Sequence, residues 1–289
     1  MADANLAEAF LGEWLDGHRV LTPLEAMNSS TWLVEADGGR YALRISDPSN
    51  EPGLRAAAWL DERGVRTGAP LRMEVRDRRL VALLRFVDGQ PLTFNDEEAV
   101  GTTLGRVHRL LRDAPVPEHM DRWPWPWLDP TVIEEPALRS AAVAAIDRAE
   151  RLAPSLTHGI LHSDPAPEAF LDAAGDIGLI DWGSSCHGPL LFDVASAWMY
   201  TRNYDRLIDA YARTGPLDRD ELAYTPDFLA FRLALQAWYF STRVATNDLT
   251  GIEGPAGNEE GLAHARGGLL GGQPQRKGRR SRRLSRSPG

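Results

Sequence analysis

Short apolar stretches separated by turn residues dominate the first 87 positions and indicate an antiparallel sheet. Asp37-Gly-Gly39 lies between two such stretches and predicts a tight hairpin turn. Apolar residues with helical spacing predict a helix over 6–15 and a second over 54–63, which Gly64 would end. The predicted strands cover 20–24, 32–36, 40–45, 71–75 and 79–86.

The pattern changes at Asp88-Gly-Gln-Pro91, which we interpret as a hinge. Helical spacing prevails after it and is interrupted by one small hairpin, with strands over 168–171 and 177–181. We therefore expect an α+β fold with two lobes, residues 1–87 and 88–272, followed by a tail over 273–289. The predicted helices of the second lobe cover 97–111, 136–152, 190–200, 204–212 and 226–245.

Charge is distributed unevenly along the chain. The 289 residues have a formal net charge of −9, although seven of the 32 basic residues lie in the last 14 positions. The rest of the chain is therefore strongly acidic, which argues against nucleic-acid binding by the folded body and is compatible with a cationic small-molecule substrate. The basic tail has the low apolar content and like-charge repulsion of a disordered segment. Its alternative role is an electrostatic contact with RNA, DNA or an anionic membrane.

Lysine and cysteine each occur once, as Lys277 and Cys186. A phosphate-binding loop that ends in Gly-Lys-Ser/Thr is therefore excluded from the body of the chain, as are an intramolecular disulfide and a zinc site made of several cysteines. No apolar run approaches the ~20 residues that span a bilayer, and the acidic start has no basic region typical of a secretory signal. We expect a cytoplasmic protein that does not enter a membrane.

Two carboxylates flank the predicted small hairpin. Asp164 precedes its first strand and Asp181 ends its second strand. Because the start of one antiparallel strand and the end of the next lie at the same end of a hairpin, we expect the two side chains to be neighbours. Such a pair suits a divalent cation beside a general base, since Mg²⁺ is typically held by one or two carboxylates and substrate phosphates. The alternative is a pair of loop aspartates that cap turns.

Several segments, in order and at matching separations, resemble the aminoglycoside phosphotransferase family, which includes relatives of choline kinase and fructosamine kinase. The resemblance spans about residues 20 to 250 and implies the two-lobed protein-kinase-like fold, with a nucleotide-binding first lobe and a catalytic, substrate-binding helical lobe. It rests on Arg40-Tyr-Ala-Leu-Arg44, Val87-Asp-Gly-Gln-Pro-Leu92, Leu104-Gly-Arg-Val-His108, His162-Ser-Asp164, Ile180-Asp-Trp-Gly183 and Gly188-Pro-Leu-Leu-Phe-Asp193.

The resemblance implies roles for three residues of the catalytic segments. Asp164 would orient and deprotonate the acceptor hydroxyl, and Asp181 would hold Mg²⁺ against the phosphates of ATP or GTP. His162 would support the loop that carries Asp164, with a purely structural histidine as the alternative.

The same resemblance implies nucleotide contacts in the first lobe. Arg44 stands where the family has a phosphate-pairing basic residue, with an exposed edge-strand arginine as the alternative. The segment 83–87, with Leu84 and Phe86, would face the adenine. The nucleotide-covering loop corresponds to 27–31, where Asn28, Ser29 and Ser30 would either bond phosphates or close a turn; these three residues follow Met27.

Two positions depart from the family pattern. Ala169 stands where the family has a metal-binding asparagine, so the metal site would be rebuilt around Glu168 and Asp181 or would lose one metal. The helical glutamate that would pair with Arg44 aligns with Gly53. Glu51 is a possible substitute, although an exposed glutamate in a first helical turn is the favoured interpretation.

Three further features have a structural and a functional interpretation. Arg122-Trp-Pro-Trp-Pro-Trp127 would either seal a proline-stiffened connection, which we favour, or form a wall of the acceptor pocket. We expect Asp193 to cap a helix or bond the catalytic loop rather than to bind metal. The adjacent pair Cys186-His187 does not form a catalytic dyad, because neighbouring side chains rarely face each other.

The combined pattern predicts an ATP- or GTP-dependent phosphotransferase that uses Mg²⁺ and acts on a hydroxyl of a small molecule. Amino sugars, aminoglycoside-like compounds and other antibiotics or metabolites all remain open as acceptors, because the fold does not choose the substrate. The alternative is a pseudokinase that binds a ligand or partner without phosphoryl transfer. The sequence does not indicate an oligomeric state.

Overall fold

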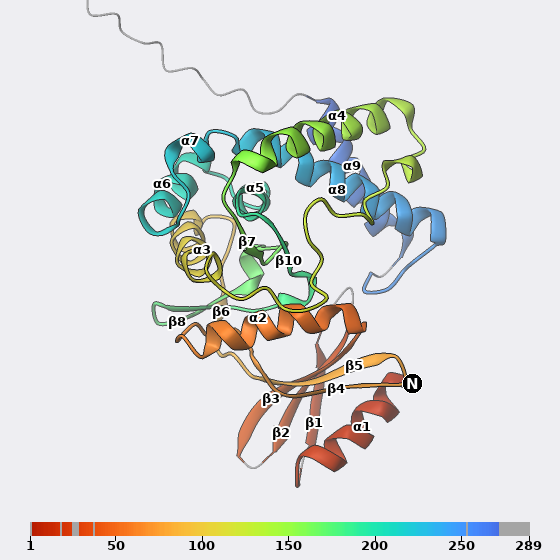
Figure 1. Ribbon diagram of the computed structural model, residues 1–289. Helices are drawn as coiled ribbons and strands as arrows, with labels where there is room; N and C mark the ends of the chain where they lie inside the picture. Colours follow the sequence, from red (N-terminus) through yellow and green to blue (C-terminus); the bar gives the residue numbers. More distant parts are fainter. Residues whose placement is uncertain (1, 18, 25–28, 37, 253, 272–289) are drawn as a thin grey trace, which may run out of the picture.

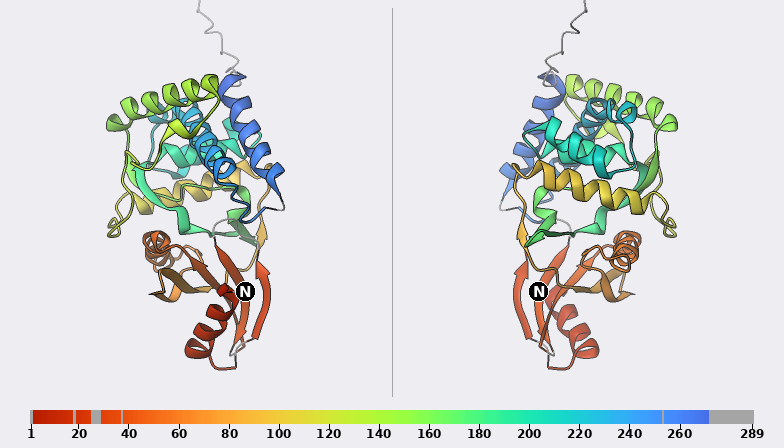
Figure 2. Two further views of the ribbon diagram at one scale, coloured as in Figure 1. Left: turned by 90° about the vertical axis from the view of Figure 1, so that its right-hand side faces the viewer. Right: turned by 90° about the vertical axis from the view of Figure 1, so that its left-hand side faces the viewer.

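The computed structural model describes residues 2–17, 19–24, 29–36, 38–252 and 254–271. It has an α+β architecture, with a five-stranded antiparallel sheet at one end of the molecule and a lobe made mainly of helices at the other (Figure 1). Figure 2 shows the same two parts from opposite sides. This confirms the predicted fold class, while the lobe boundary at residues 87 and 88 stays a prediction.

The first lobe contains the predicted helices and strands in the predicted order. Its sheet has the order β1-β2-β3-β5-β4, and all neighbours are antiparallel. The elements are α1 (Ala2–Trp14), β1 (Arg19–Leu24), β2 (Ser30–Ala36), β3 (Gly39–Ser46), α2 (Glu51–Asp61), β4 (Pro70–Arg76) and β5 (Arg79–Arg85). Both helices begin before the predicted residue, because the sequence prediction started at the first strongly apolar position.

The two faces of this sheet are covered by different elements. One face packs against α1, where Phe10 and Leu11 contact a core that includes Val34, Leu43 and Ile45. The opposite face packs against Leu54 of α2 in a cluster with Leu80, Ala82 and Leu84. Because strand residues alternate between faces, this division decides which side chains of β2 and β3 turn toward the helical lobe.

The helical lobe confirms the five predicted helices and adds two more. These are α3 (Glu97–Leu111), α4 (Pro136–Leu152), α5 (Leu191–Met199), α6 (Tyr204–Thr214), α7 (Arg219–Leu222), α8 (Thr225–Thr246) and α9 (Pro255–Leu270). The short α7 and the long α9 were not predicted. None of the described helices combines the length and hydropathy that a membrane crossing requires.

The second lobe also contains two small sheets. β7 (His158–Leu161) pairs with β10 (Cys186–Pro189), and neither strand was predicted. β8 (Phe170–Ala173) and β9 (Asp176–Leu179) form the expected hairpin, which starts two residues later than predicted because residues 167–169 form a 3₁₀ turn. The predicted hinge contains an additional strand, β6 (Gln90–Pro91), which pairs with β8 at the edge of this sheet.

The tryptophan segment serves mainly as packing, as favoured from the sequence. Trp123 and Trp125 contact each other edge-to-face and both contact the ring of Phe231, and Trp125 is 6% exposed. Trp127 is 38% exposed and stacks on Trp125. The first two rings therefore belong to the core of the helical lobe.

Candidate functional site

The loop after β7 carries His162 and Asp164, and a buried carboxylate holds its backbone in place. Asp193, at the start of α5, accepts hydrogen bonds from the backbone N–H groups of His162 at 2.7 Å and Ser163 at 2.8 Å. Ser163 has a left-handed φ of +76°, a conformation that a non-glycine residue keeps only when its surroundings enforce it. Asp193 thus bonds the loop that carries Asp164, as the sequence analysis expected.

Asp193 is itself fixed from the opposite side. Its Oδ2 lies 3.0 Å from Nε2 of His108 in α3, and Nδ1 of His108 lies 2.8 Å from the hydroxyl of Tyr211 in α6. His108 and Asp193 are fully buried, where an unpaired polar group would be costly. Helices α3, α5 and α6 are therefore linked to the loop through one hydrogen-bonded chain.

His162 connects this loop to the end of the β8–β9 hairpin. Its Nε2 lies 2.7 Å from the carbonyl oxygen of Ile180, and its ring contacts Trp182 edge-to-face. The side chain is 1% exposed, so it has no access to solvent for direct proton transfer. The contact brings the Asp164 loop to the residue that precedes Asp181, and the loop-supporting role of His162 stays a prediction.

The Asp164 carboxylate is 53% exposed and receives two donors on one oxygen. The Tyr200 hydroxyl and an Nη of Arg232 both donate to Oδ1 at 3.0 Å. Arg232 also donates to the Tyr200 oxygen at 3.2 Å, so the three groups form a closed cluster. Tyr200 follows α5 and Arg232 lies on α8, and the sequence interpretation missed both. The available signal was one arginine within the apolar stretch 228–238.

Both donors keep their protons, for different reasons. It raises the pKa of the Tyr200 hydroxyl well above its ordinary value, so this group remains a donor. Burial works against the charge on Arg232, but Tyr200 and the Asp164 carboxylate outweigh it and raise the pKa of the guanidinium. The cluster therefore keeps a positive charge beside Asp164.

Asp181 lies at the junction of the lobes and meets Arg44 from the sheet. Nη1 of Arg44 donates to Oδ1 of Asp181 at 2.7 Å, and Nη2 lies 3.4 Å from Oδ1 of Asn50. The side chain of Arg44 is 12% exposed, whereas that of Asp181 is 66% exposed. The arginine thus faces the junction and is not the exposed edge-strand residue of the alternative interpretation.

A close packing contact explains why position 53 of α2 carries a glycine and no glutamate. A Cβ atom on Gly53 would lie 1.8 Å from the carbonyl oxygen of Trp182, so α2 packs directly on the backbone that follows Asp181. No side chain fits at this point. Glu51 does not take over the role, because it pairs with Arg55 four residues later on the same helix.

Residues 167–169 form a 3₁₀ turn in which Glu168 and Ala169 lie in different environments. Ala169 is 6% exposed, and its backbone accepts from the N–H of Ile180 and donates to Ala166. Glu168 is exposed and lies close enough to Tyr200 to affect its titration. Ala169 therefore faces the core, whereas the Glu168 side chain is exposed.

The predicted nucleotide contacts lie on both faces of the sheet. Ser29 bonds the Thr31 hydroxyl at 3.2 Å, and Thr31 pairs with Arg44 in register, so this side faces the lobe junction. Ser30 donates to Asp3 of α1 at 2.7 Å, so its hydroxyl points away from the lobe junction, and its phosphate contact stays a prediction. Asn28 lies outside the described residues.

The predicted adenine contacts follow one another at the end of β5. Leu84 shares the α2-facing cluster with Leu54, and Phe86 lies just beyond the strand with the guanidinium of Arg40 over its ring at 4.7 Å. Arg40 also pairs with Asp88. Leu84 and Phe86 therefore lie where β5 leads into the segment between the lobes.

The oxygen donors around Asp181 fit a magnesium–nucleotide complex. Asp181 has a left-handed φ of +68° and an exposed carboxylate, with the Asn50 amide oxygen close to its arginine partner. Among the described residues no three His, Cys, Asp or Glu side chains form a metal site by themselves. Mg²⁺ does not require such a cage, because it takes few carboxylates and keeps phosphate and water ligands.

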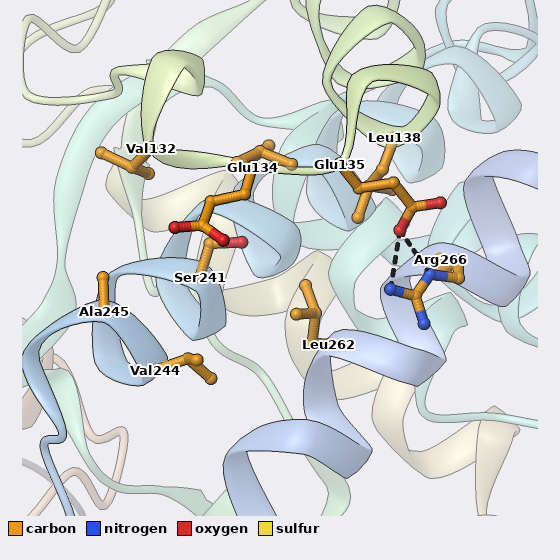
Figure 3. Close-up of a pocket in the computed structure, with 10 residues that line it drawn as sticks. Val132, Glu134, Glu135, Leu138, Ser241, Val244, Ala245, Leu262 and Arg266 are labelled. Atoms are coloured by element: carbon orange, nitrogen blue, oxygen red, sulfur yellow. Dashed lines mark hydrogen bonds and ion pairs between the residues drawn. The ribbon is translucent and has the colours of Figure 1, made fainter.

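A separate hollow lies on the helical lobe, as Figure 3 shows. It has a volume of about 420 Å³ and lies between α8, α9 and the segment that precedes α4. Arg266 and Glu135 form an ion pair on its wall. The hollow shares no residue with the Asp164 and Asp181 site.

Comparisons with known proteins agree with this geometry. A family model described as "Phosphotransferase enzyme family" matches residues 20–226, which is most of the chain. No curated protein sequence matches.

Several solved structures share the fold. An amicoumacin kinase in complex with AMP-PNP, Ca²⁺ and Ami superposes with a TM-score of 0.73 at 17% identity, over 92% of both chains. A microcompartment-associated aminopropanol kinase gives 0.72 at 18% identity, over 92% of this chain and 95% of the other. The choline kinase LicA from Streptococcus pneumoniae gives 0.61 at 12% identity, over 91% and 99%. Together with the family match, these results show that the chain belongs to the aminoglycoside phosphotransferase family and is a small-molecule phosphotransferase.

Proposed function

We propose that the chain transfers the γ-phosphoryl group of ATP or GTP, bound with Mg²⁺, to a hydroxyl of a small molecule. Asp164 is the general base and Asp181 is a metal ligand. The observation that carries the proposal is the convergence of the two carboxylates. The His162–Ile180 bond ties their loops together, and each carboxylate meets a mostly buried arginine.

The chemical step needs positioning more than covalent chemistry from the protein. The acceptor oxygen bonds to the γ-phosphorus while the bond to the β–γ bridging oxygen breaks, and the hydroxyl proton passes to Asp164. Bound Mg²⁺ offsets the negative charge of the phosphates. Arg44 supplies a fixed positive charge on the sheet side, where its planar group can bind two phosphate oxygens.

The remaining nucleotide contacts come from the first lobe. Leu84 and Phe86 border the adenine, and the Ser29 hydroxyl lies on the face of the sheet that carries Arg44. Glu168 is the second candidate metal ligand, since Ala169 has no ligand atom. His162 acts by holding the loop.

The proposed acceptor is an amino sugar, an aminoglycoside-like antibiotic or another small molecule that carries a hydroxyl. The similar structures are named for amicoumacin, aminopropanol, choline and aminoglycosides. The acidic body of this chain is compatible with a cationic acceptor and unfavourable for nucleic acid.

A thermal-shift titration with ATP and GTP, each with and without Mg²⁺, tests the nucleotide site without knowledge of the acceptor. A ligand at about 100 times its Kd stabilises the folded protein by roughly 2.7 kcal/mol. We expect a Mg²⁺-dependent rise in Tm that Asp181→Ala abolishes. Asp176→Ala is the matched control, because Asp176 is an exposed carboxylate of the same hairpin that also pairs with an arginine, Arg66.

The outcome separates the two functions considered. No shift of the well-folded wild type with either nucleotide would favour the pseudokinase alternative. If the wild type shifts, Asp164→Asn should keep the shift and lower turnover by about 10²–10⁴-fold, the usual size of a general-base contribution. Near-normal turnover of Asp164→Asn would remove Asp164 from that role.

A further inference from the structure

Tyr200 and Arg232, the two donors to Asp164, neither bind the nucleotide nor accept the proton in the proposed transfer. Both bond the same carboxylate oxygen, Oδ1, at 3.0 Å. In the part of the chain that the structure describes, no donor reaches the other oxygen, Oδ2. The Asp164 side chain is 53% exposed, so the carboxylate is accessible to an incoming hydroxyl while Oδ1 is already bonded.

Arg232 is buried and depends on this arrangement for its hydrogen-bond partners. Its side chain is 10% exposed, and its bonds are to Asp164 and Tyr200, while its Nε has no partner in the described chain. A buried charge that loses its counter-ion is strongly destabilised, so the guanidinium and the carboxylate hold each other in one geometry. The Tyr200 hydroxyl donates a second hydrogen bond to the same oxygen and restrains it from another direction.

We infer that Arg232 and Tyr200 are positioning residues that clamp Oδ1 of Asp164 and thereby aim Oδ2 at the acceptor hydroxyl. The inference rests on the proposed function. The backbone of the loop is held by Asp193, but this contact leaves the side-chain torsions of Asp164 free. The clamp fixes those torsions, and a general base works only from a narrow range of distances and directions.

The clamp also assigns the two oxygens different tasks. Oδ1 keeps its two hydrogen bonds throughout, and Oδ2 accepts the proton of the hydroxyl as the new phosphorus–oxygen bond forms. Tyr200 does not compete for that proton, because burial keeps its own hydroxyl protonated.

The test uses slow hydrolysis of Mg·ATP by the full chain, with water as the acceptor, and compares wild type with Arg232→Met, Arg232→Lys and Tyr200→Phe. We expect Arg232→Met to lower kcat by about tenfold or more with little change in the KM for ATP, since positioning affects the chemical step. Arg232→Lys should recover part of kcat, and Tyr200→Phe should lower kcat less than Arg232→Met. Arg148→Met is the matched control, because it removes another arginine–carboxylate contact to α8, with Asp227.

Each other outcome contradicts the inference. An unchanged kcat in folded Arg232→Met, a change confined to KM, or a lysine variant no better than methionine would overturn it while leaving the proposed function intact. If Arg232→Met fails to fold, Arg232→Lys and Tyr200→Phe decide the question: both at wild-type kcat would overturn the clamp. A wild type that neither hydrolyses ATP nor gains Tm with Mg·ATP would instead reject the proposed function itself.

Discussion

Residues 168 and 169 are neighbours in one 3₁₀ turn, yet one side chain is exposed and the other is buried. Ala169 turns into the core and hydrogen bonds Ile180 through its backbone, whereas Glu168 is exposed on the side of Tyr200. The side chain of Ala169 has no ligand atom, so Glu168 stays the proposed source of a second carboxylate ligand.

Replacing Glu168 with alanine is expected to raise the Mg²⁺ concentration needed for half-maximal activity severalfold, because a carboxylate ligand is lost. The measurement is a Mg²⁺ titration of ATP hydrolysis at saturating nucleotide. Asp176→Ala, an exposed carboxylate on the nearby hairpin, should leave the midpoint unchanged. An unaltered midpoint in Glu168→Ala would exclude Glu168 from the metal site.

At the scale of the element, α2 lies against the turn that follows Asp181. The contact is backbone on backbone, since a Cβ on Gly53 would lie 1.8 Å from the Trp182 carbonyl oxygen. The glycine costs helix propensity but allows this close approach. It also explains why the arginine of β3 pairs directly with Asp181 rather than with a helical glutamate.

Substituting this glycine is expected to destabilise the fold. Gly53→Ala should lower the free energy of unfolding by about 1–3 kcal/mol, since the added methyl group displaces backbone in a packed contact. Gly267→Ala is the opposite control: its Cβ would meet nothing within 4 Å, so helix propensity should raise stability by roughly 0.4–1 kcal/mol. The measurement is urea unfolding of both variants. Equal stability of Gly53→Ala and wild type would contradict the close contact.

The helix α9 shows the same effect on a larger scale. Its glycines and weak periodicity did not predict a helix, yet it packs along α8. A Cβ on Gly261 would lie 2.3 Å from the Phe240 ring, so the small residue permits the two helices to approach. The helix is therefore stabilised by tertiary contact rather than by local preference.

At the scale of the molecule, the Arg44–Asp181 ion pair joins the sheet to the helical lobe. The two residues are separated by 137 positions, and their contact at 2.7 Å lies where the lobes meet. A nucleotide bound there would share the arginine with Asp181. We therefore expect the affinity for nucleotide to depend on how the two lobes are held together.

Arg44→Met should weaken nucleotide binding by about tenfold or more, since a hydrogen bond to a charged group contributes roughly 1.5–3 kcal/mol. The measurement is calorimetric titration with Mg·ATP. Arg79→Met is the control, because Arg79 pairs with Asp3 on the side of the sheet that α1 covers. Equal affinity of Arg44→Met and wild type would remove Arg44 from the phosphate site.

Much of the fold was predictable from local pattern. Helices α3 and α4 begin and end at the predicted residues, because each has a strong apolar stripe and a clear start and stop. The strands β7 and β10 were missed because they pair across more than 20 intervening residues, whereas the equally short β8 and β9 are joined by a recognisable turn. Burial raises the pKa of the Cys186 thiol, which keeps it protonated.

By itself, the sequence determined the order of the elements in the first lobe, five helices of the second lobe, the family and the positions of the two carboxylates, because these depend on local periodicity and on short segments that stay together along the chain. Only the tertiary structure decided what surrounds those carboxylates. Arg232 contacts Asp164 although the two residues are 68 positions apart. Ser30 faces α1 because side chains alternate along a strand, and only the tertiary structure shows which face of the sheet α1 covers. Contacts between distant segments follow from how burial and close packing bring elements together, and no local pattern records that pairing.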